Sequence, residues 1–157
     1  MNVSIKKAKR QECDLIHHMQ IKSFAATLEK YKDYDTSPGN ETVEKILNRF
    51  DQLATDYYLI ENENKIVGAI RIVRNEKENV YRVSPIFILP EHHGKGIAQE
   101  VFELIEKEYS WVAKWQLDTI LQEQQLCYLY EKLGYRKTGV EEIISDKMTI
   151  VYYEKLI

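Results

Sequence analysis

The sequence is poor in the residues that staple or interrupt a chain: among 157 residues it has 2 cysteines, 3 prolines and 6 glycines. Cys13 and Cys127 are too few and too far apart to form a Cys-x-x-Cys redox or zinc motif, and a disulfide between them has no sequence support. Internal repeats, low-complexity segments and an interdomain linker are also absent. We therefore expect a single domain over residues 1–157, with a core large enough to need neither a metal nor a disulfide.

Long hydrophobic runs and a strong excess of one charge are absent as well. No apolar run approaches the length of a membrane span, and charged residues from Lys6 onward interrupt the hydrophobic region that a secretory signal needs. The formal net charge of −3 gives no reason to expect nucleic-acid binding. These absences predict a cytoplasmic protein with neither a membrane nor a nucleic-acid partner.

What is present is a regular pattern of hydrophobic residues, which make up 44% of the chain and argue against disorder. Alternation predicts a strand over Val3–Lys7, and a helix follows around Cys13–Phe24. Turn-forming residues predict a loop over Tyr31–Asn40. A stripe with the helical period predicts a second helix. This stripe consists of Val43, Ile46, Leu47, Phe50, Leu53 and Ala54.

The middle of the chain predicts a hairpin followed by a further strand. Tyr57–Glu61 and Ile66–Arg74 are apolar segments separated by an Asn-Glu-Asn sequence, which is typical of a hairpin turn. The next strand is Val80–Leu89. Because Pro85 within it cannot donate to a ladder, we expect a bulge or a local separation from a neighbouring strand.

The last third of the chain predicts the strand Trp115–Leu121 and the helix Gln124–Leu133. Two closing strands, Tyr135–Val140 and Met148–Tyr153, flank the acidic segment Glu141–Asp146, which we expect to be a loop. With one more helix after residue 96, the element order is β-α-α-β-β-β-α-β-α-β-β. This order predicts an α/β fold with a mixed, mostly antiparallel seven-stranded sheet and about four helices on both faces.

The segment from Pro90 to Ala98 is the most informative part of the sequence. It follows a short apolar run that reads as a buried strand and precedes an amphipathic helix. Gly94 and Gly96 leave backbone N–H groups unobstructed where a helix N-terminus offers unpaired donors and positive potential. The junction is suited to bind a phosphate or pyrophosphate, although Gly-x-Gly also occurs in ordinary turns.

Two familiar phosphate-binding motifs are excluded by spacing. A P-loop requires a hydroxyl residue after its lysine, but Lys95 is followed by Gly96. A dinucleotide fingerprint requires a third glycine at the position of Gln99. Its acidic residue would fall near Lys114, which has the wrong charge.

Two other motifs carry a resemblance to a known family. Residues 93–98 read His-Gly-Lys-Gly-Ile-Ala, which matches Gln/Arg-x-x-Gly-x-Gly/Ala except that His93 replaces the first residue. Residues 129–135 read Leu-Tyr-Glu-Lys-Leu-Gly-Tyr, which matches a second motif at the end of a helix. With these motifs in this order and at this separation, nearly the whole chain resembles the GNAT superfamily of acyl-CoA-dependent N-acetyltransferases.

The resemblance implies that acetyl-CoA lies between the strands Val80–Leu89 and Trp115–Leu121, which separate to admit it. Backbone groups at the end of the first strand would pair with the pantetheine arm like an added strand, and the loop N–H groups would hold the pyrophosphate. Lys95 either adds its charge or points to solvent. Glu123 stands where the family often has Asn, a contact that Gln122 or Gln124 could replace. The implied cofactor-binding residues are Phe87, Ile88, Leu89, His93, Gly94, Lys95, Gly96, Ile97, Ala98, Glu123 and Tyr130.

Tyr130 is the implied catalytic residue. A neutral amine that attacks a thioester develops an oxyanion, which a backbone N–H near Ile88 would stabilise. The leaving thiolate needs a proton or a strong hydrogen bond, and the family motif places the Tyr130 hydroxyl in this role. Cys127, three residues earlier, shares its helix face and reads as a small packing residue rather than as an acyl carrier.

The general base is left open by the sequence. Many family members place a glutamate on the strand before the pyrophosphate loop, whereas this strand offers Tyr81, Arg82 and Ser84. The base is absent, acts through water or comes from another loop. The histidines are candidates in principle, but we expect one buried and one exposed residue in each adjacent pair, without metal-ligand spacing. These pairs are His17 with His18 and His92 with His93.

Together these features predict an N-acetyltransferase that moves the acetyl group to a primary amine of a small molecule by direct attack in a ternary complex. Protein N-terminal or lysine acetylation and a non-catalytic acyl-CoA sensor are the alternatives, and a homodimer is compatible with each. Acidic residues near the expected acceptor entrance would favour a cationic amine if they converge, or are simply solvated. They are Glu29, Asp33, Asp35, Glu141, Glu142 and Asp146.

Overall fold

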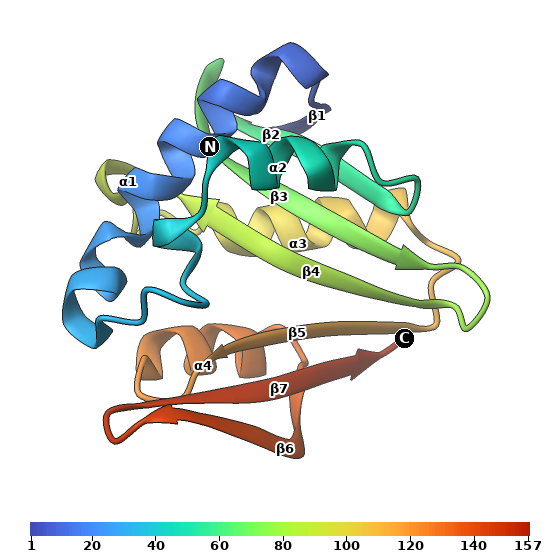
Figure 1. Cartoon of the computed structure of the whole chain (residues 1–157). Helices are drawn as coiled ribbons and strands as arrows, with labels where there is room; N and C mark the ends of the chain where they lie inside the picture. The colour runs from blue at the N-terminus through green and yellow to red at the C-terminus, as the bar shows by residue number, and fades with distance from the viewer.

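The computed structural model describes all residues from 1 to 157 and contains one seven-stranded sheet in the order β1-β2-β3-β4-β5-β7-β6 (Figure 1). The strands are β1 (Val3–Lys7), β2 (Thr55–Asn62), β3 (Lys65–Asn75), β4 (Val80–Ile88), β5 (Lys114–Ile120), β6 (Arg136–Ser145) and β7 (Met148–Leu156). The helices are α1 (Cys13–Tyr31), α2 (Val43–Phe50), α3 (Ile97–Glu108) and α4 (Gln124–Lys132). No helix is both long enough and apolar enough to cross a membrane.

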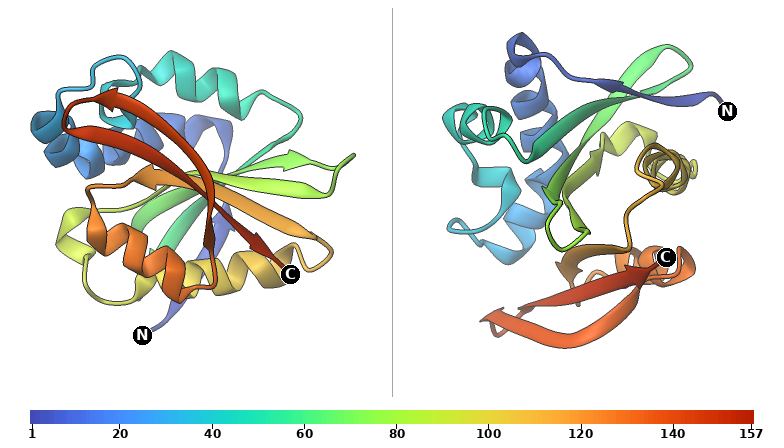
Figure 2. Two further views of the ribbon diagram at one scale, coloured as in Figure 1. Left: turned by 90° about the horizontal axis from the view of Figure 1, so that it is seen from below. Right: turned by 90° about the vertical axis from the view of Figure 1, so that its right-hand side faces the viewer.

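Two hydrophobic clusters, one on each face of the sheet, hold the helices in place. On one face Ile16 of α1 and Ile46 of α2 pack with Leu59 of β2, and all three side chains are fully buried. On the other face Val101 of α3 and Tyr130 of α4 belong to the larger cluster. Figure 2 shows the two helix layers on either side of the strands. The predicted seven-stranded fold with helices on both faces is confirmed.

The parallel strands β4 and β5 pair over only a short stretch and then diverge (Figure 1). On its other side, β4 pairs with β3 along most of its length, but the register shifts between Ile70 and Ile72 of β3. Pro85 of β4 lies opposite this shift, where it donates to neither neighbour. The expected disruption at Pro85 is therefore confirmed. The pairs that join β4 to β5 are Val80–Lys114, Tyr81–Trp115 and Arg82–Gln116.

Local sequence explains the turn and the cap that frame this sheet. Glu63 and Asn64 connect β2 to β3 with φ angles of 52° and 65°. Positive φ angles at both central residues are what a type I′ hairpin turn requires, and this confirms the predicted hairpin. Thr42 begins α2, because its side chain accepts a 3.3 Å hydrogen bond from the backbone N–H of Lys45. Such a cap satisfies one of the free donors of the first helical turn.

Two predicted boundaries are wrong. α2 ends at Phe50, and Leu53, which the sequence assigned to its stripe, is 93% exposed. The chain turns after Asp51, so Leu53 and Ala54 keep the helical spacing without belonging to the helix. β6 continues to Ser145, so most of the expected acidic loop is strand. Nearly every residue of β6 is exposed, and no apolar alternation marks such an edge strand.

Candidate active site

The loop between β4 and α3 presents a row of unpaired backbone donors. No backbone N–H from Gly94 to Gln99 donates to a protein acceptor, whereas the helical ladder begins with Glu100 N–H donating to the Gly96 carbonyl at 3.3 Å. These groups lie at the N-terminus of a 12-residue helix, where the peptide dipoles create positive potential. The loop is therefore suited to bind a phosphate or pyrophosphate.

Both glycines of this loop are required by its conformation. Gly94 and Gly96 have φ angles of 75° and 78°, in the left-handed region that other residues rarely adopt. A Cβ at Gly94 would meet no atom within 4 Å, and one at Gly96 would meet only the end of Met1 at 3.9 Å. Space beside the loop is thus open to a ligand. Lys95 is exposed to solvent.

The end of β4 directs one of its backbone N–H groups into the gap beside β5. Leu89 N–H donates to the Val67 carbonyl at 2.8 Å, and the Leu89 carbonyl accepts from His92 N–H at 2.9 Å. Because successive residues of a strand point their backbone groups to opposite sides, the N–H of Ile88 points towards β5. No β5 residue pairs with it.

Of the three residues of β4 and its end that were predicted to contact the cofactor through their backbone, only one has a backbone group that faces the gap. Leu89 has no free backbone group, and Phe87 pairs with Ala69 of β3. Ile88 is therefore the one of the three predicted residues whose backbone faces the gap. The Nε2 atom of His93 lies 2.7 Å from the Ile88 carbonyl, so the histidine at the first motif position fastens the loop to the strand end.

Tyr130 lies on the α3/α4 side of the gap, in a cluster of aromatic rings. Its ring centroid is 5.8 Å from that of Phe102 and 6.2 Å from that of Tyr135. Both contacts are edge-to-face arrangements, which fix the orientation of the ring. Burial raises the pKa of the Tyr130 hydroxyl, and the charge of Asp118 raises it further. The hydroxyl therefore stays protonated near neutral pH, as a proton donor must.

Asp118 lies on the opposite side of the gap. Leu117 of β5 belongs to the core beneath α3 and α4, so its neighbour Asp118 faces the α1/α2 side. The carboxylate forms an ion pair with Arg82 of β4. Burial raises the pKa of Asp118, although the charge of Arg82 opposes this effect. The sequence did not identify Asp118, because a single acidic residue in an apolar strand carries no local signal.

Glu123 connects the two diverging parts of the fold. Its Oε2 atom accepts a 2.5 Å hydrogen bond from the Tyr31 hydroxyl and a 2.8 Å hydrogen bond from Lys30 Nζ, both at the end of α1. These donors lower the pKa of Glu123, with Lys30 making the larger contribution. The carboxylate at the family's Asn position is therefore engaged by α1.

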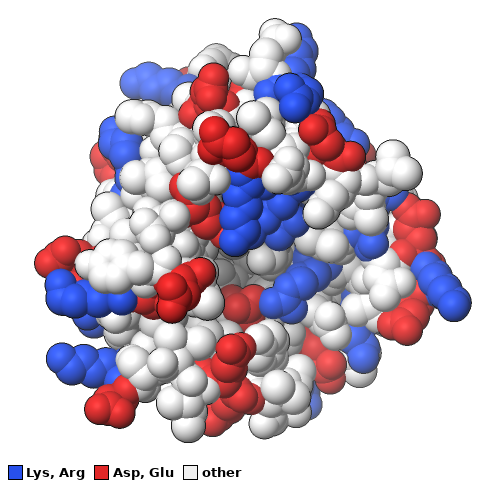
Figure 3. Space-filling model, viewed as in Figure 1, with Lys and Arg blue, Asp and Glu red and all other residues white.

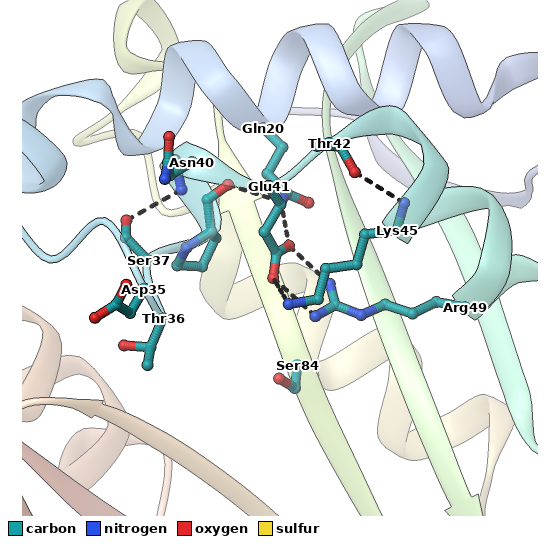
Figure 4. A network of polar contacts seen from close by, with 12 residues as sticks. Gln20, Asp35, Thr36, Ser37, Asn40, Glu41, Thr42, Lys45, Arg49 and Ser84 are labelled. Carbon is teal, nitrogen blue, oxygen red and sulfur yellow. Dashed lines mark hydrogen bonds and ion pairs between the residues drawn. The ribbon is translucent and has the colours of Figure 1, made fainter.

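The segment between α1 and α2 is fixed by polar contacts centred on Glu41 (Figure 4). Arg49 donates two hydrogen bonds to the Glu41 carboxylate, at 2.7 and 2.8 Å, and Gln20 donates a third at 2.7 Å. Asp33 is turned inward and accepts from Thr36 N–H at 3.1 Å. Asp33 therefore contributes little to an outward-facing acidic surface.

The remaining candidates have simpler surroundings. Cys13 and Cys127 are both free thiols, and Cys127 Sγ lies 3.8 Å from the Ile120 carbonyl. The expectation of one buried histidine in each adjacent pair is wrong. His17 and His92 are only half-buried, and the other member of each pair is exposed.

Residues 27–157 match the protein family described as "Acetyltransferase (GNAT) domain". No match was found among curated proteins. Solved structures give the same fold. The spermidine N-acetyltransferase from Vibrio cholerae in complex with CoA and spermine has a TM-score of 0.76 at 18% identity, over 98% of this chain and 95% of that one.

Two further similar structures are those of enzymes named for the modification of ribosomal proteins. An acetyltransferase from Salmonella typhimurium that modifies the N-terminal serine of ribosomal protein L7/L12 has a TM-score of 0.77 at 14% identity, over 100% of this chain and 96% of that one. The ribosomal-protein-S18-alanine N-acetyltransferase from Escherichia coli has a TM-score of 0.77 at 10% identity, over 99% and 94% of the two chains. At these identities the likeness concerns the fold.

Proposed function

Because the chain belongs to the GNAT family of acetyltransferases, we propose that it transfers the acetyl group of acetyl-CoA to a primary amine of a small molecule. The amine attacks directly while both substrates are bound. The observation that carries this proposal is the row of unpaired N–H groups from Gly94 to Gln99, which follows the end of β4, the part of the strand that no longer pairs with β5. That loop fits a pyrophosphate, and the gap beside it fits an extended chain.

We assign stabilisation of the oxyanion to the backbone at the end of β4. Bound acetyl-CoA supplies the activated thioester carbonyl. The Ile88 N–H points into the gap and stabilises negative charge as it develops on the carbonyl oxygen. Because this donor belongs to a strand paired with β3, it is held in position before the reaction begins.

We assign proton transfer to one group on each side of the gap. Asp118 faces α1 and α2, where it accepts a proton from the incoming amine, and its raised pKa brings it nearer to the working pH of a base. Tyr130 lies on the α3/α4 side and donates a hydrogen bond or a proton to the departing sulfur. The amine therefore enters on one side of the sheet, and the thiol leaves on the other.

An amine panel that follows CoA release from acetyl-CoA tests this proposal. The panel holds polyamines, amino acids, aminosugars and short peptides with free N-termini, since the similar structures are named for polyamine and ribosomal-protein acceptors. Turnover with small amines and none with peptides supports the proposal. Turnover restricted to peptides indicates a protein acetyltransferase. Acetyl-CoA binding without CoA release from any amine indicates a sensor.

A further inference from the structure

One arginine on the α1/α2 face of the sheet has no partner for its charge. Arg71 lies on β3 and is only 9% exposed, yet it forms no ion pair. Its Nε group donates to the Ser84 carbonyl of β4. The two Nη groups have no hydrogen-bond partner in the protein and are not sealed from solvent. A mostly buried cation without a counter-charge is unfavourable, and an anionic ligand that reached the two Nη groups would relieve this cost.

The charged side chains near Arg71 do not supply it with an ion-pair partner. Arg49 of α2 has two hydrogen bonds to Glu41, and Arg82 of β4 is paired with Asp118. Burial lowers the pKa of Arg71, and the positive charges of Arg49 and Arg82 act in the same direction, while Tyr57 and Glu41 oppose them without restoring the ordinary value. Both nearby carboxylates are thus engaged by other arginines, which leaves Arg71 without an ion-pair partner of its own.

A second unsatisfied polar group lies beside Arg71. Tyr57 of β2 is directly opposite Arg71 in the β2–β3 ladder, so the two side chains share a face. The Tyr57 ring stacks on Phe50 at 6.3 Å, and its buried hydroxyl, which lies near the Arg49 guanidinium, has no acceptor for its proton. An anion at Arg71 would supply the missing acceptor for this hydroxyl as well.

Arg71 and Tyr57 lie on the face of the sheet from which the acceptor amine is proposed to enter. In Figure 4 the Glu41 carboxylate meets Lys45 and Arg49 above Ser84 of β4, on the face from which the amine is proposed to enter. Figure 3 shows a hollow on this face with basic side chains along its upper margin. Ser84 and Ile88 belong to the same strand. At the usual rise of an extended strand they are about 13 Å apart.

We propose that the acceptor carries a carboxylate in addition to its reacting amine, and that Arg71 binds this carboxylate with the help of the Tyr57 hydroxyl. A guanidinium with two free Nη groups suits a carboxylate, which accepts two parallel hydrogen bonds. The separation along β4 fits an acceptor whose amine and carboxylate lie several bonds apart, as in the ε-amine of lysine. This inference rests on the proposed acetyl transfer.

A purely structural role for Arg71 accounts for part of these observations. The Nε bond to Ser84 holds the irregular region around Pro85, where the β3–β4 register shifts. That role uses neither Nη group and does not involve the Tyr57 hydroxyl. A test must therefore measure acceptor preference, which a structural role would leave unchanged.

The test compares lysine, lysinamide and cadaverine in steady-state assays of CoA release. Lysinamide keeps the size of lysine without its carboxylate charge, and cadaverine removes the carboxylate altogether. Because charge-assisted hydrogen bonds are the stronger ones, we expect kcat/KM to be about ten- to a hundredfold higher for lysine than for the other two. Equal values, or a preference for cadaverine or spermidine, would overturn the inference.

Variants then locate the preference. Arg71→Met should bring the lysine-to-lysinamide ratio of kcat/KM close to one, whereas Arg136→Met, at an exposed position of β6, should keep the ratio of the unaltered protein. An unchanged ratio in folded Arg71→Met would contradict the assignment. Should Arg71→Met not fold, Tyr57→Phe removes only the unpaired hydroxyl and should still lower the ratio. An unaltered ratio in Tyr57→Phe would then contradict the inference.

Binding without turnover separates this inference from the proposed function. In the absence of acetyl-CoA, lysine should raise the Tm of the protein more than lysinamide does, because only the native state binds it. If no amine releases CoA but lysine still stabilises selectively, the acetyl-transfer proposal fails and the carboxylate site stands. If amines are acetylated equally well with and without a carboxylate, the acetyl-transfer proposal stands and the carboxylate site fails.

Discussion

Arg82 and Asp118 form an ion pair across β4 and β5 at the place where these strands stop pairing. Arg82 belongs to the last registered pair, and Asp118 lies two residues beyond its partner Gln116 on β5. The ion pair therefore stands at the closed end of the gap. It holds a carboxylate on the side from which an acceptor would arrive.

Asp118→Asn should lower kcat/KM by roughly 10²-fold or more, the usual contribution of a positioned base. Since burial raises the pKa of Asp118, the unaltered enzyme should gain activity with pH above the ordinary carboxyl range, and the variant should lose this rise. A pH–rate profile of both proteins gives the measurement. Glu44→Gln, an exposed change on α2, is the matched control. An unaltered profile in Asp118→Asn would remove Asp118 from proton transfer.

Tyr130→Phe removes one hydroxyl and almost no volume, so the aromatic cluster with Phe102 and Tyr135 should persist. We expect acetyl-CoA affinity to survive and kcat to fall by roughly 10²-fold. Single-turnover kinetics with a saturating acceptor isolate the chemical step. If that step proceeds at the same rate in the variant, another group protonates the leaving sulfur.

Gly96→Asp should abolish the rise in Tm that acetyl-CoA or CoA gives to the native protein. The new carboxylate would face the pyrophosphate at a helix N-terminus, where like charges repel. Gly96→Asn is the matched control, because Asn has the same shape and tolerates the positive φ angle without the charge. The Asn variant should retain part of the shift. Stabilisation of the unaltered protein by ATP or NAD but not by CoA would contradict the cofactor assignment.

Glu41 should make folding stability depend on acidity. Burial alone would raise the pKa of Glu41, but Arg49, Gln20 and Lys45 together hold it below its ordinary value. A carboxyl whose pKa is lower in the folded chain stabilises it fully above the unfolded pKa of about 4.3. This contribution is lost as the pH falls through the folded pKa.

Urea unfolding of the unaltered protein and Glu41→Gln between pH 7 and pH 3 measures this effect. We expect the variant to be less stable by roughly 1–3 kcal/mol at pH 7, because Arg49 loses its counter-charge. The difference should shrink towards pH 3. A difference that stays constant over this range would show that the Glu41 charge does not stabilise the fold.

The sequence predicted those features that depend on local pattern. The apolar stripe of α3, the glycines before it and the hairpin at Glu63 and Asn64 each depend on residues close together in the sequence. The structure contains all three. The irregularity in the β3–β4 pairing was expected because Pro85 removes a donor wherever it stands in a strand, whereas the separation of β4 from β5 was expected only from the family resemblance. These features require no knowledge of which segments become neighbours.

The features that the sequence missed depend on pairing between distant segments. Asp118 can be recognised as a site residue only from its ion pair with Arg82. Arg71 can be recognised only because the nearby carboxylates are already paired with other arginines. The full length of β6 escaped prediction because both of its faces are exposed, so that no period of two distinguishes it from a loop. The end of α2 was missed because Leu53 continued the helical spacing beyond the last turn.

The brief contact between β4 and β5 also bears on how the protein opens. Three registered backbone pairs join the part built on β1 to β4 with the part built on β5, β7 and β6, in addition to their shared core and the contacts of Glu123 with α1. A ligand lying between the diverging strands would bridge both parts and couple their stabilities. Amide protons of β5 and β7 should then exchange through opening of the C-terminal part in the free protein, and only through global unfolding once that bridge is in place.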